Sequence, residues 1–221
     1  MRTGIKICCI SSLQEAATAI HSGADALGLV GKMPGGPGTI DDELIASIAI
    51  TIHPPVSSFL LTSRQSAGEI IDHVKKTGVS TVQIVDELIN GTYEQIREEI
   101  PHLRIVQVIH ITGEESIGEA LKVHEKVDSL LLDSGNPRAA VKTLGGTGNI
   151  HDWNISSRIV KLVSVPVFLA GGLNADNVSE AIRIVRPFAV DVCSGVRTSG
   201  LLDSDKLNSF IAAVRADENH K

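Results

Sequence analysis

The sequence has few aromatic residues and no excess of positive charge. Only 3% of its 221 residues are Phe, Trp or Tyr, and 20 Lys and Arg stand against 26 Asp and Glu, which gives a formal net charge of −6. Surfaces that bind nucleic acid need positive charge for the phosphate backbone, and single-strand binders also need aromatic rings on which bases stack. Both are scarce here, so we expect no nucleic-acid partner.

A long apolar run is also missing. No stretch approaches the roughly 20 apolar residues that cross a bilayer, and the first residues show no basic segment followed by an apolar stretch and a cleavage site. We therefore expect a cytoplasmic protein without a membrane partner. Because 43% of the residues are hydrophobic, the chain can still bury a substantial core.

Cysteine is rare, and its three positions are Cys8, Cys9 and Cys193. An odd count in a chain of this length argues against a disulfide framework. The nearest histidines, His21 and His53, have no ligand spacing to the adjacent pair, so we expect no metal site. Cys8 and Cys9 could then be buried fillers of the core or contribute a catalytic thiol.

The sequence does contain a regular alternation of short β-branched runs and segments with helical spacing. The segment 11–23, for example, opens on serines suited to helix capping and closes on Gly23. Eight runs are predicted to be strands: 5–10, 26–30, 56–62, 81–85, 104–111, 129–134, 165–172 and 189–195.

Eight strand and helix units with nearly continuous apolar strands predict a parallel sheet that is buried on both faces. A closed (β/α)8 TIM barrel fits this count. A doubly wound open sheet is the alternative, but no Gly-rich dinucleotide fingerprint follows the first strand. No linker rich in Pro, Ser or Gly divides the chain, so we predict one α/β barrel domain over residues 1–221.

In such a barrel the active site lies at the carboxyl ends of the strands. The last two predicted strands end in "AGGLNADNV" and "CSGVRTSG", where small residues let backbone N–H groups approach an anion. Glycines also serve simply as turn residues, but two such stretches at neighbouring strands favour a phosphate site. We predict that phosphate binds among four residues: Gly171, Gly172, Ser194 and Gly195.

A third glycine cluster follows the sixth predicted strand, in "GGTGNIHDW" at 145–153. It could be an ordinary flexible connection, but loops longer than about 12 residues in compact domains tend to be functional. We expect its first four residues to close over a ligand. These residues are Gly145, Gly146, Thr147 and Gly148.

These motifs resemble the phosphoribosylanthranilate isomerase family, and the stretch from Asp133 to Val196 agrees with it in order, spacing and residue type. The matching segments are "KICCI", "GADALGLV", "VQIV", "LLLDS", "GGTG" with "DW", "PVFLAGGLNADNV" and "VDVCSGV". The resemblance implies a single barrel of the ribulose-phosphate-binding type. It also implies a small phosphorylated substrate, a monomer or homodimer, and a reaction without a cofactor.

The implied reaction is the Amadori rearrangement of N-(5-phosphoribosyl)anthranilate to 1-(2-carboxyphenylamino)-1-deoxyribulose 5-phosphate, a step of tryptophan biosynthesis. The family's general base and general acid match Cys8 and Asp133. An acid must protonate the ribose ring oxygen so that the ring opens, and a base must then remove the proton from the adjacent carbon. Without Asp133 and the glycine loops, a buried structural thiol would be the better interpretation of Cys8.

Side-chain parity predicts how the first strand presents its residues. Lys6 and Cys8 lie two positions apart and should face the barrel interior together, while Cys9 should face the surrounding helices as a small apolar residue. Two unpaired buried charges would be costly, so we expect Lys6 to pair with Asp191 of the neighbouring eighth strand. A lysine near Cys8 would also favour its thiolate form.

The segment 31–40, "GKMPGGPGTI", departs from the family pattern. The family carries a Ser-Pro-Arg motif there, whose arginine holds the carboxylate of anthranilate, and the aligned position is Gly38. Cys9 also replaces a glycine, Val85 a histidine, and Arg197 an acidic residue. Another cation could take over the carboxylate, and the candidates are Arg64, Arg197 and Lys32. Arg64 is the first choice because it follows the third strand directly, and Arg197 is the second, although for either arginine taken singly a solvated surface charge is the more common role.

The loss of this arginine leaves an alternative open. The chain could be a divergent paralogue that isomerises, or only binds, another phosphorylated sugar derivative. A related phosphosugar lyase or synthase would be expected to show a catalytic lysine and glutamate at strand ends, and that set is not found. A sensor without catalytic activity would need neither Cys8 nor Asp133, so their presence favours an enzyme.

Overall fold

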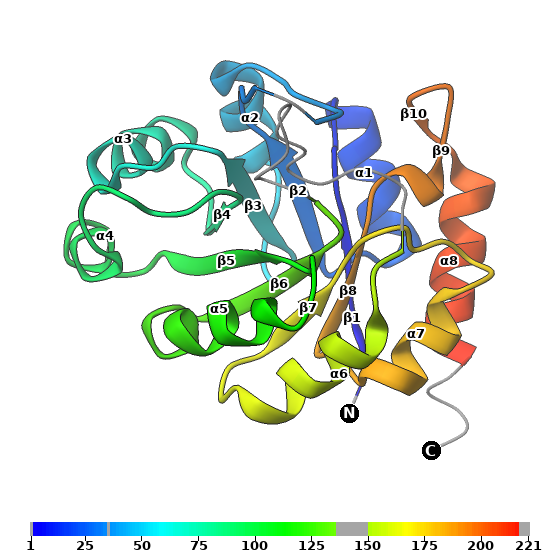
Figure 1. The fold of residues 1–221 in the computed structure, drawn as a ribbon. Coiled ribbons are helices and arrows are strands. Elements are labelled where there is room, and N and C mark those ends of the chain that lie inside the picture. Colours follow the sequence, from blue (N-terminus) through cyan, green and yellow to red (C-terminus); the bar gives the residue numbers. More distant parts are fainter. Residues whose placement is uncertain (1, 35, 136–149, 217–221) are drawn as a thin grey trace.

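The computed structural model describes residues 2–34, 36–135 and 150–216 as a barrel of strands surrounded by helices (Figure 1). The predicted ligand-covering residues Gly145, Gly146, Thr147 and Gly148 lie outside the described residues. The first strand rises from the N-terminus at the foot of the barrel in this view. Because the strands are parallel, their carboxyl ends all meet at the opposite end of the barrel.

The strands form one closed barrel in sequence order, from β1 next to β2 around to β8 next to β1. Every neighbouring pair is parallel, which confirms the predicted TIM barrel. The strand bounds are β1 Gly4–Ile7, β2 Ala26–Val30, β3 Ser57–Thr62, β4 Thr81–Ile84, β5 Arg104–His110, β6 Ser129–Asp133, β7 Val167–Leu169 and β8 Ala189–Val192. All eight lie within the predicted segments or extend them by one residue.

The helices cover the outside of the barrel (Figure 1). Helix α1 begins after Ser12, whose side chain accepts a hydrogen bond from the Glu15 N–H, and ends at Gly23 in a left-handed conformation, as the sequence predicts. The bounds are α1 Leu13–Ser22, α2 Asp42–Ala49, α3 Ala67–Thr77, α4 Tyr93–Glu99, α5 Glu115–Val123, α6 Trp153–Leu162, α7 Val178–Val185 and α8 Ser204–Ala216. Short 3₁₀ helices span η1 His124–Lys126 and η2 Ser194–Val196, and β9 Arg197–Thr198 pairs with β10 Leu201–Leu202.

Alternation along the strands divides the core into two layers. Outward residues such as Ile7 and Leu60 pack against the helices, in a cluster that includes Ile70 of α3. Inward residues such as Phe59 and Phe168 fill the barrel interior, where their rings meet edge to face at 5.7 Å. Burial of each large side chain stabilises the folded state by about 1.5–3 kcal/mol. The two layers together therefore hold the strand ends in fixed positions.

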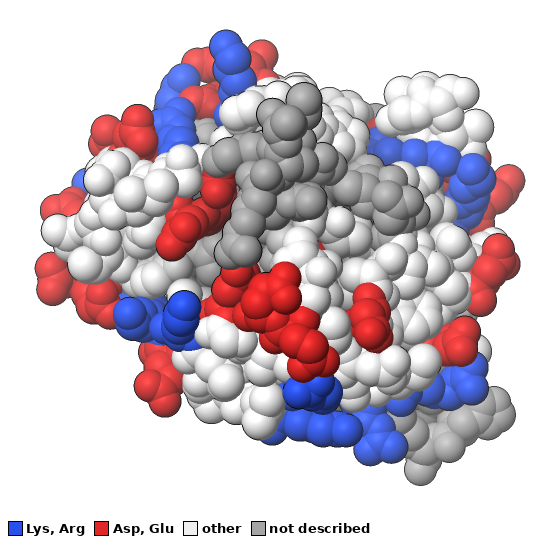
Figure 2. All heavy atoms as spheres, in the orientation of Figure 1, with Lys and Arg blue, Asp and Glu red and all other residues white. Residues whose placement is uncertain are grey.

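Charges of both signs are distributed over the surface. On the face of the described chain shown in Figure 2, a group of acidic residues lies near the centre, and basic residues form separate groups toward the edges. None of the helices in the described ranges is long and apolar enough to cross a membrane.

Candidate active site

A pocket opens at the carboxyl ends of the strands, where the sequence places the active site. It brings together both residues proposed for catalysis and three of the four proposed for phosphate binding. These are Cys8, Asp133, Gly171, Gly172 and Ser194. The remaining walls come mainly from the strands β4, β5 and β8 and from the segment after β2, with Gln83, Val108, Asp191, Met33 and Pro37 among them.

Cys8 lies just beyond β1, against Gly28 of the neighbouring strand β2. A Cβ atom added at Gly28 would lie 2.8 Å from the Cys8 Sγ and 3.1 Å from the Lys6 Nζ. Lys6 and Cys8 therefore project to the same side, which confirms the parity prediction for this pair. Gly28 provides the space that both side chains occupy.

Lys6 pairs with Asp191 inside the barrel, as predicted. The Lys6 Nζ lies 2.9 Å from an Asp191 carboxylate oxygen, and the two residues are in register across β1 and β8. Burial alone lowers the pKa of Lys6, but the negative charges of Asp191 and of a Cys8 thiolate outweigh it and raise that pKa above its ordinary value. The ammonium group is thus a permanent positive charge beside Cys8.

Burial dominates the acidity of Cys8. It raises the pKa of the thiol to about 11, although the Lys6 charge acts in the opposite direction. The carboxylates of Asp191 and Asp133 raise this pKa further because they repel the thiolate. Cys8 is therefore a neutral thiol at pH 7 in the unliganded protein, and Lys6 limits the energy needed to ionise it.

Asp133 ends β6 and is also largely buried, with 9% of its surface exposed. One carboxylate oxygen accepts a hydrogen bond from the Ser134 N–H at 2.7 Å. Its charge raises the pKa of the Cys8 thiol, and both residues line the same pocket. An acid and a base in one pocket can move protons on opposite sides of a small ligand.

The glycine segments after β7 and β8 meet on the side of the pocket away from β3. Gly171 and Gly172 have φ angles of +84° and +65°, which glycine adopts without strain. A Cβ added at Gly195 would lie only 2.0 Å from the Leu173 carbonyl oxygen, so the two segments pack backbone against backbone. This contact requires glycine and keeps large side chains away from the pocket edge.

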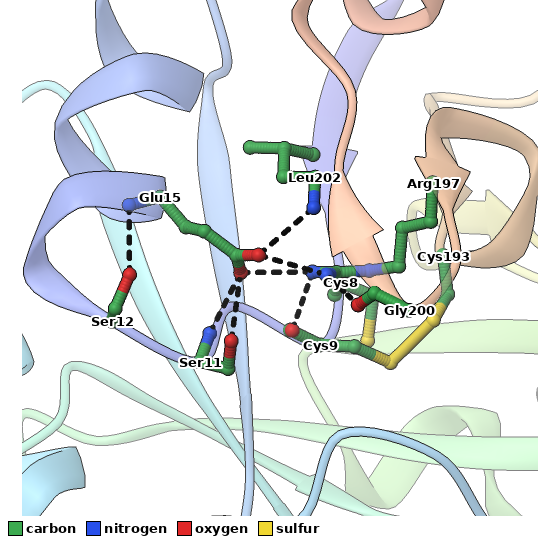
Figure 3. A network of polar contacts seen from close by, with 9 residues as sticks. All are labelled: Cys8, Cys9, Ser11, Ser12, Glu15, Cys193, Arg197, Gly200 and Leu202. Carbon is green, nitrogen blue, oxygen red and sulfur yellow. Dashed lines mark hydrogen bonds and ion pairs between the residues drawn. A yellow bond between two sulfur atoms is a disulfide. The ribbon is translucent and has the colours of Figure 1, made fainter.

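Cys9 differs from its prediction. It does not face the helices but lines the pocket and forms a disulfide with Cys193 (Figure 3). The parity rule fails because β1 ends at Ile7 and Cys9 has a left-handed φ of +63°, so the alternation of an extended strand no longer applies. The expectation drawn from the odd cysteine count is wrong for this pair as well, since one bridge forms and Cys8 stays free.

The three cations proposed for a carboxylate differ in their surroundings. The Arg197 guanidinium is only 8% exposed and is bound to Glu15, so it is not available to a ligand. Arg64 donates to the Glu69 carbonyl oxygen at 3.1 Å and lies outside the pocket lining. Lys32 is exposed in the segment after β2, next to the pocket residue Met33, and makes no hydrogen bond or ion pair with other described residues.

Gly38 packs tightly against Cys9. A Cβ atom at position 38 would lie 2.6 Å from the Cys9 Cβ, and Gly38 itself has a φ of +74°. The side chain gained at position 9 therefore occupies the space that a side chain at position 38 would need. The two departures from the family pattern are thus complementary in space, which sequence reasoning did not foresee.

His151 is a pocket neighbour that the sequence interpretation missed. Its Nε2 lies 2.7 Å from the Ser156 Oγ, and a Cβ at Gly171 would lie 3.0 Å from its Nδ1. Burial lowers the pKa of His151, although the charge of Asp133 acts in the opposite direction, so the ring is neutral at pH 7. The only signal was its position in the glycine-rich segment 145–153, which was treated as a loop.

The described residues offer no ready metal site. Within residues 2–34, 36–135 and 150–216, no three His, Cys, Asp or Glu side chains lie close enough to hold an ion.

Comparison with known families gives a match over almost the whole chain. Residues 5–213 match the family model described as N-(5'-phosphoribosyl)anthranilate (PRA) isomerase. A Methanosarcina mazei protein named N-(5'-phosphoribosyl)anthranilate isomerase 2 is 37% identical over 215 residues, which cover 96% of this chain and 94% of that protein. A Methanocella arvoryzae isomerase is 35% identical and covers 96% and 98%.

Solved structures agree with this match. A phosphoribosyl anthranilate isomerase from Thermotoga maritima superposes with a TM-score of 0.81 at 30% identity, covering 97% of this chain and 99% of that one. A second isomerase was solved in complex with reduced 1-(o-carboxyphenylamino)-1-deoxyribulose 5-phosphate, and it superposes with a TM-score of 0.78 at 27% identity over 97% and 99%. A further Thermotoga maritima structure, with a TM-score of 0.79 at 27% identity over 97% and 99%, is described as monomers generated from a dimeric enzyme.

Proposed function

Because this chain belongs to the N-(5'-phosphoribosyl)anthranilate isomerase family, we propose that it catalyses the Amadori rearrangement of N-(5-phosphoribosyl)anthranilate in tryptophan biosynthesis. The observation that carries the proposal is one pocket lined by Cys8, Asp133 and the glycine segment after β7. A phosphorylated sugar needs an anion site and two proton-transfer groups, and this pocket offers both.

Asp133 is the general acid and Cys8 the general base in this proposal. Asp133 gives a proton to the ribose ring oxygen, the ring opens to an iminium, and the Cys8 thiolate removes the proton from the adjacent carbon. The resulting enolamine then becomes the ketone product. One proton leaves the enzyme and one returns, so the isomerisation has no net proton requirement.

The electrostatics of the pocket fit this exchange. Cys8 and Asp133 can share one proton in two ways: as a thiol beside a carboxylate, or as a thiolate beside a carboxylic acid. Only the second arrangement is reactive in this mechanism. Lys6 favours the reactive form because its charge lowers the cost of the thiolate. Phosphate binding at Gly171, Gly172, Ser194 and Gly195 would hold the sugar between the two groups.

Lys32 is the cation that we assign to the substrate carboxylate. It lies in the same segment as the pocket residues Met33 and Pro37, and no other described residue pairs with it. Arg197 is already bound by Glu15, and Arg64 already donates a hydrogen bond to the Glu69 carbonyl oxygen. The exposed lysine can reach a ligand without breaking an existing contact.

The alternative function is isomerisation or binding of another phosphorylated sugar derivative. It is favoured by one observation: among the described residues that line the pocket there is no Lys or Arg. A ligand without a carboxylate would not need one.

The deciding experiment follows turnover of N-(5-phosphoribosyl)anthranilate by the loss of anthranilate fluorescence. The purified protein should convert this substrate, and its gene should restore growth of a tryptophan auxotroph that lacks the isomerase. Wild-type protein that binds phosphate but gives neither result would replace the isomerase proposal with the alternative.

A further inference from the structure

The turn after β1 is held in a conformation that its sequence does not favour. Cys9 has a φ of +63°, in the left-handed region that residues with a Cβ rarely adopt. This turn follows Cys8 directly, so it fixes the backbone on the carboxyl side of Cys8. Contacts from elsewhere in the chain must therefore stabilise it.

Arg197 supplies these contacts from the far end of the sequence (Figure 3). Its Nη2 donates hydrogen bonds to the Cys9 carbonyl oxygen and, at 3.3 Å, to the Cys8 carbonyl oxygen. Both peptide groups beside the left-handed residue are thus bound by one planar guanidinium. The side chain is 8% exposed, which limits competition from water.

The guanidinium is itself fixed by Glu15, which lies in the first turn of α1. The Arg197 Nη1 and Nη2 donate to the two Glu15 carboxylate oxygens at 3.0 and 3.1 Å, a bidentate arrangement. The carboxylate also accepts hydrogen bonds from the Ser11 N–H and the Leu202 N–H, each at 2.9 Å. Arg197 is therefore held between three segments at the carboxyl end of the barrel.

We propose that Arg197 is a positioning residue for Cys8, which acts by holding the Cys8 and Cys9 carbonyl groups and so keeps the thiol directed into the pocket. It touches no substrate in this role. The inference rests on the proposed function, in which Cys8 is the base. It also explains how Cys9 can follow the catalytic residue although glycine would adopt this turn without strain.

The disulfide between Cys9 and Cys193 restrains the same turn, so the test is made without it. In a Cys193→Ser background, Arg197→Ala should lower kcat about 10- to 100-fold with little change in KM, because small misplacements of a catalytic group have effects of this size. Arg197→Lys should not restore kcat, since one ammonium cannot reach Glu15 and both carbonyls.

A second substitution tests whether the effect passes through Cys9. Adding Cys9→Gly to the Cys193→Ser background gives a turn residue that favours a positive φ. In this background, the fold-loss of kcat caused by Arg197→Ala should be at least about five-fold smaller than with Cys9 present. The two losses are compared in a double-mutant cycle. Equal losses in both backgrounds would refute the proposal. A raised KM at unchanged kcat would refute it too, because it would mean that Arg197 binds substrate.

Two controls separate this proposal from loss of stability and from failure of the proposed function. Arg158→Ala removes an exposed ion pair between Arg158 on α6 and Glu114, which directly precedes α5, and should leave kcat unchanged. The Tm of every variant should be measured by thermal unfolding, which shows whether the protein is folded at the temperature at which kcat is determined. A lower Tm with unchanged kcat would mean a merely structural role.

If wild-type protein shows no turnover, the proposed function fails and the positioning role is decided by alkylation. In a Cys9→Ser, Cys193→Ser background, which lacks the disulfide, Cys8 is the one cysteine left of the three. Arg197→Ala should raise its rate of reaction with iodoacetamide several-fold, because release of the turn exposes a thiol that is now 5% accessible. An unchanged rate would overturn the proposal.

Discussion

The two sides of the pocket are built differently. On the side of β1, β6 and β8, the charged groups have fixed partners: Lys6 pairs with Asp191, and Asp133 accepts a hydrogen bond from the Ser134 N–H. On the side of the segment 31–40, the wall consists of Met33, Gly36 and Pro37 around an exposed lysine. In the proposed mechanism, strand ends thus carry the proton-transfer groups and a loop carries substrate recognition. A loop can change without moving the strand ends.

The largest effect is expected on the strand side. Cys8→Ser and Asp133→Asn should each lower kcat about 10²- to 10⁴-fold, because each removes a proposed proton-transfer group and leaves the barrel intact. Both variants should bind inorganic phosphate with the same affinity as wild type, which can be measured by competitive inhibition or by calorimetry. Retained turnover in both variants would mean that the chemistry lies elsewhere.

A smaller effect is expected from Lys6→Met, which leaves Asp191 buried without its partner. The free energy of unfolding should fall by about 3–5 kcal/mol, measured by urea denaturation. The pKa of Cys8 should rise above its value of about 11, since the lowering effect of Lys6 is lost. Iodoacetamide should then react more slowly with Cys8 at each pH between 8 and 10.

Lys161→Met is the matched control, because Lys161 is exposed on α6. It should change neither stability nor the alkylation profile. A profile that is the same in wild type and Lys6→Met would contradict the electrostatic coupling between Lys6 and Cys8.

The smallest effect is expected on the loop side. If Lys32 meets the substrate carboxylate, Lys32→Ala should raise KM about 10- to 150-fold, the equivalent of 1.5–3 kcal/mol for a charged hydrogen bond. The affinity for inorganic phosphate should not change. Arg64→Ala serves as the comparison and should raise KM far less, and the opposite ranking would assign the carboxylate to Arg64.

Periodicity predicted the strands well because each is buried on both faces and has a nearly continuous apolar run. It also predicted the Lys6–Asp191 pair, since neighbouring strands of a closed barrel place such charges together. It failed at Cys9, where the chain leaves the strand and a positive φ reverses the side-chain direction. The Cys9–Cys193 bridge and the contacts of Arg197 join segments more than 180 residues apart, and local patterns contain no information about such contacts.

The Cys9–Cys193 bridge also turns most of the chain into a ring. Its cysteines are 184 residues apart in sequence, so the unfolded chain with the bridge intact has far fewer conformations than the open chain. In the chain-entropy model, a loop of this length stabilises the folded state by about 5 kcal/mol. Oxidation of these two thiols at the pocket edge would therefore raise the free energy of unfolding of the whole barrel. In this model the gain comes from the smaller conformational entropy of the unfolded chain and needs no further contact in the folded one.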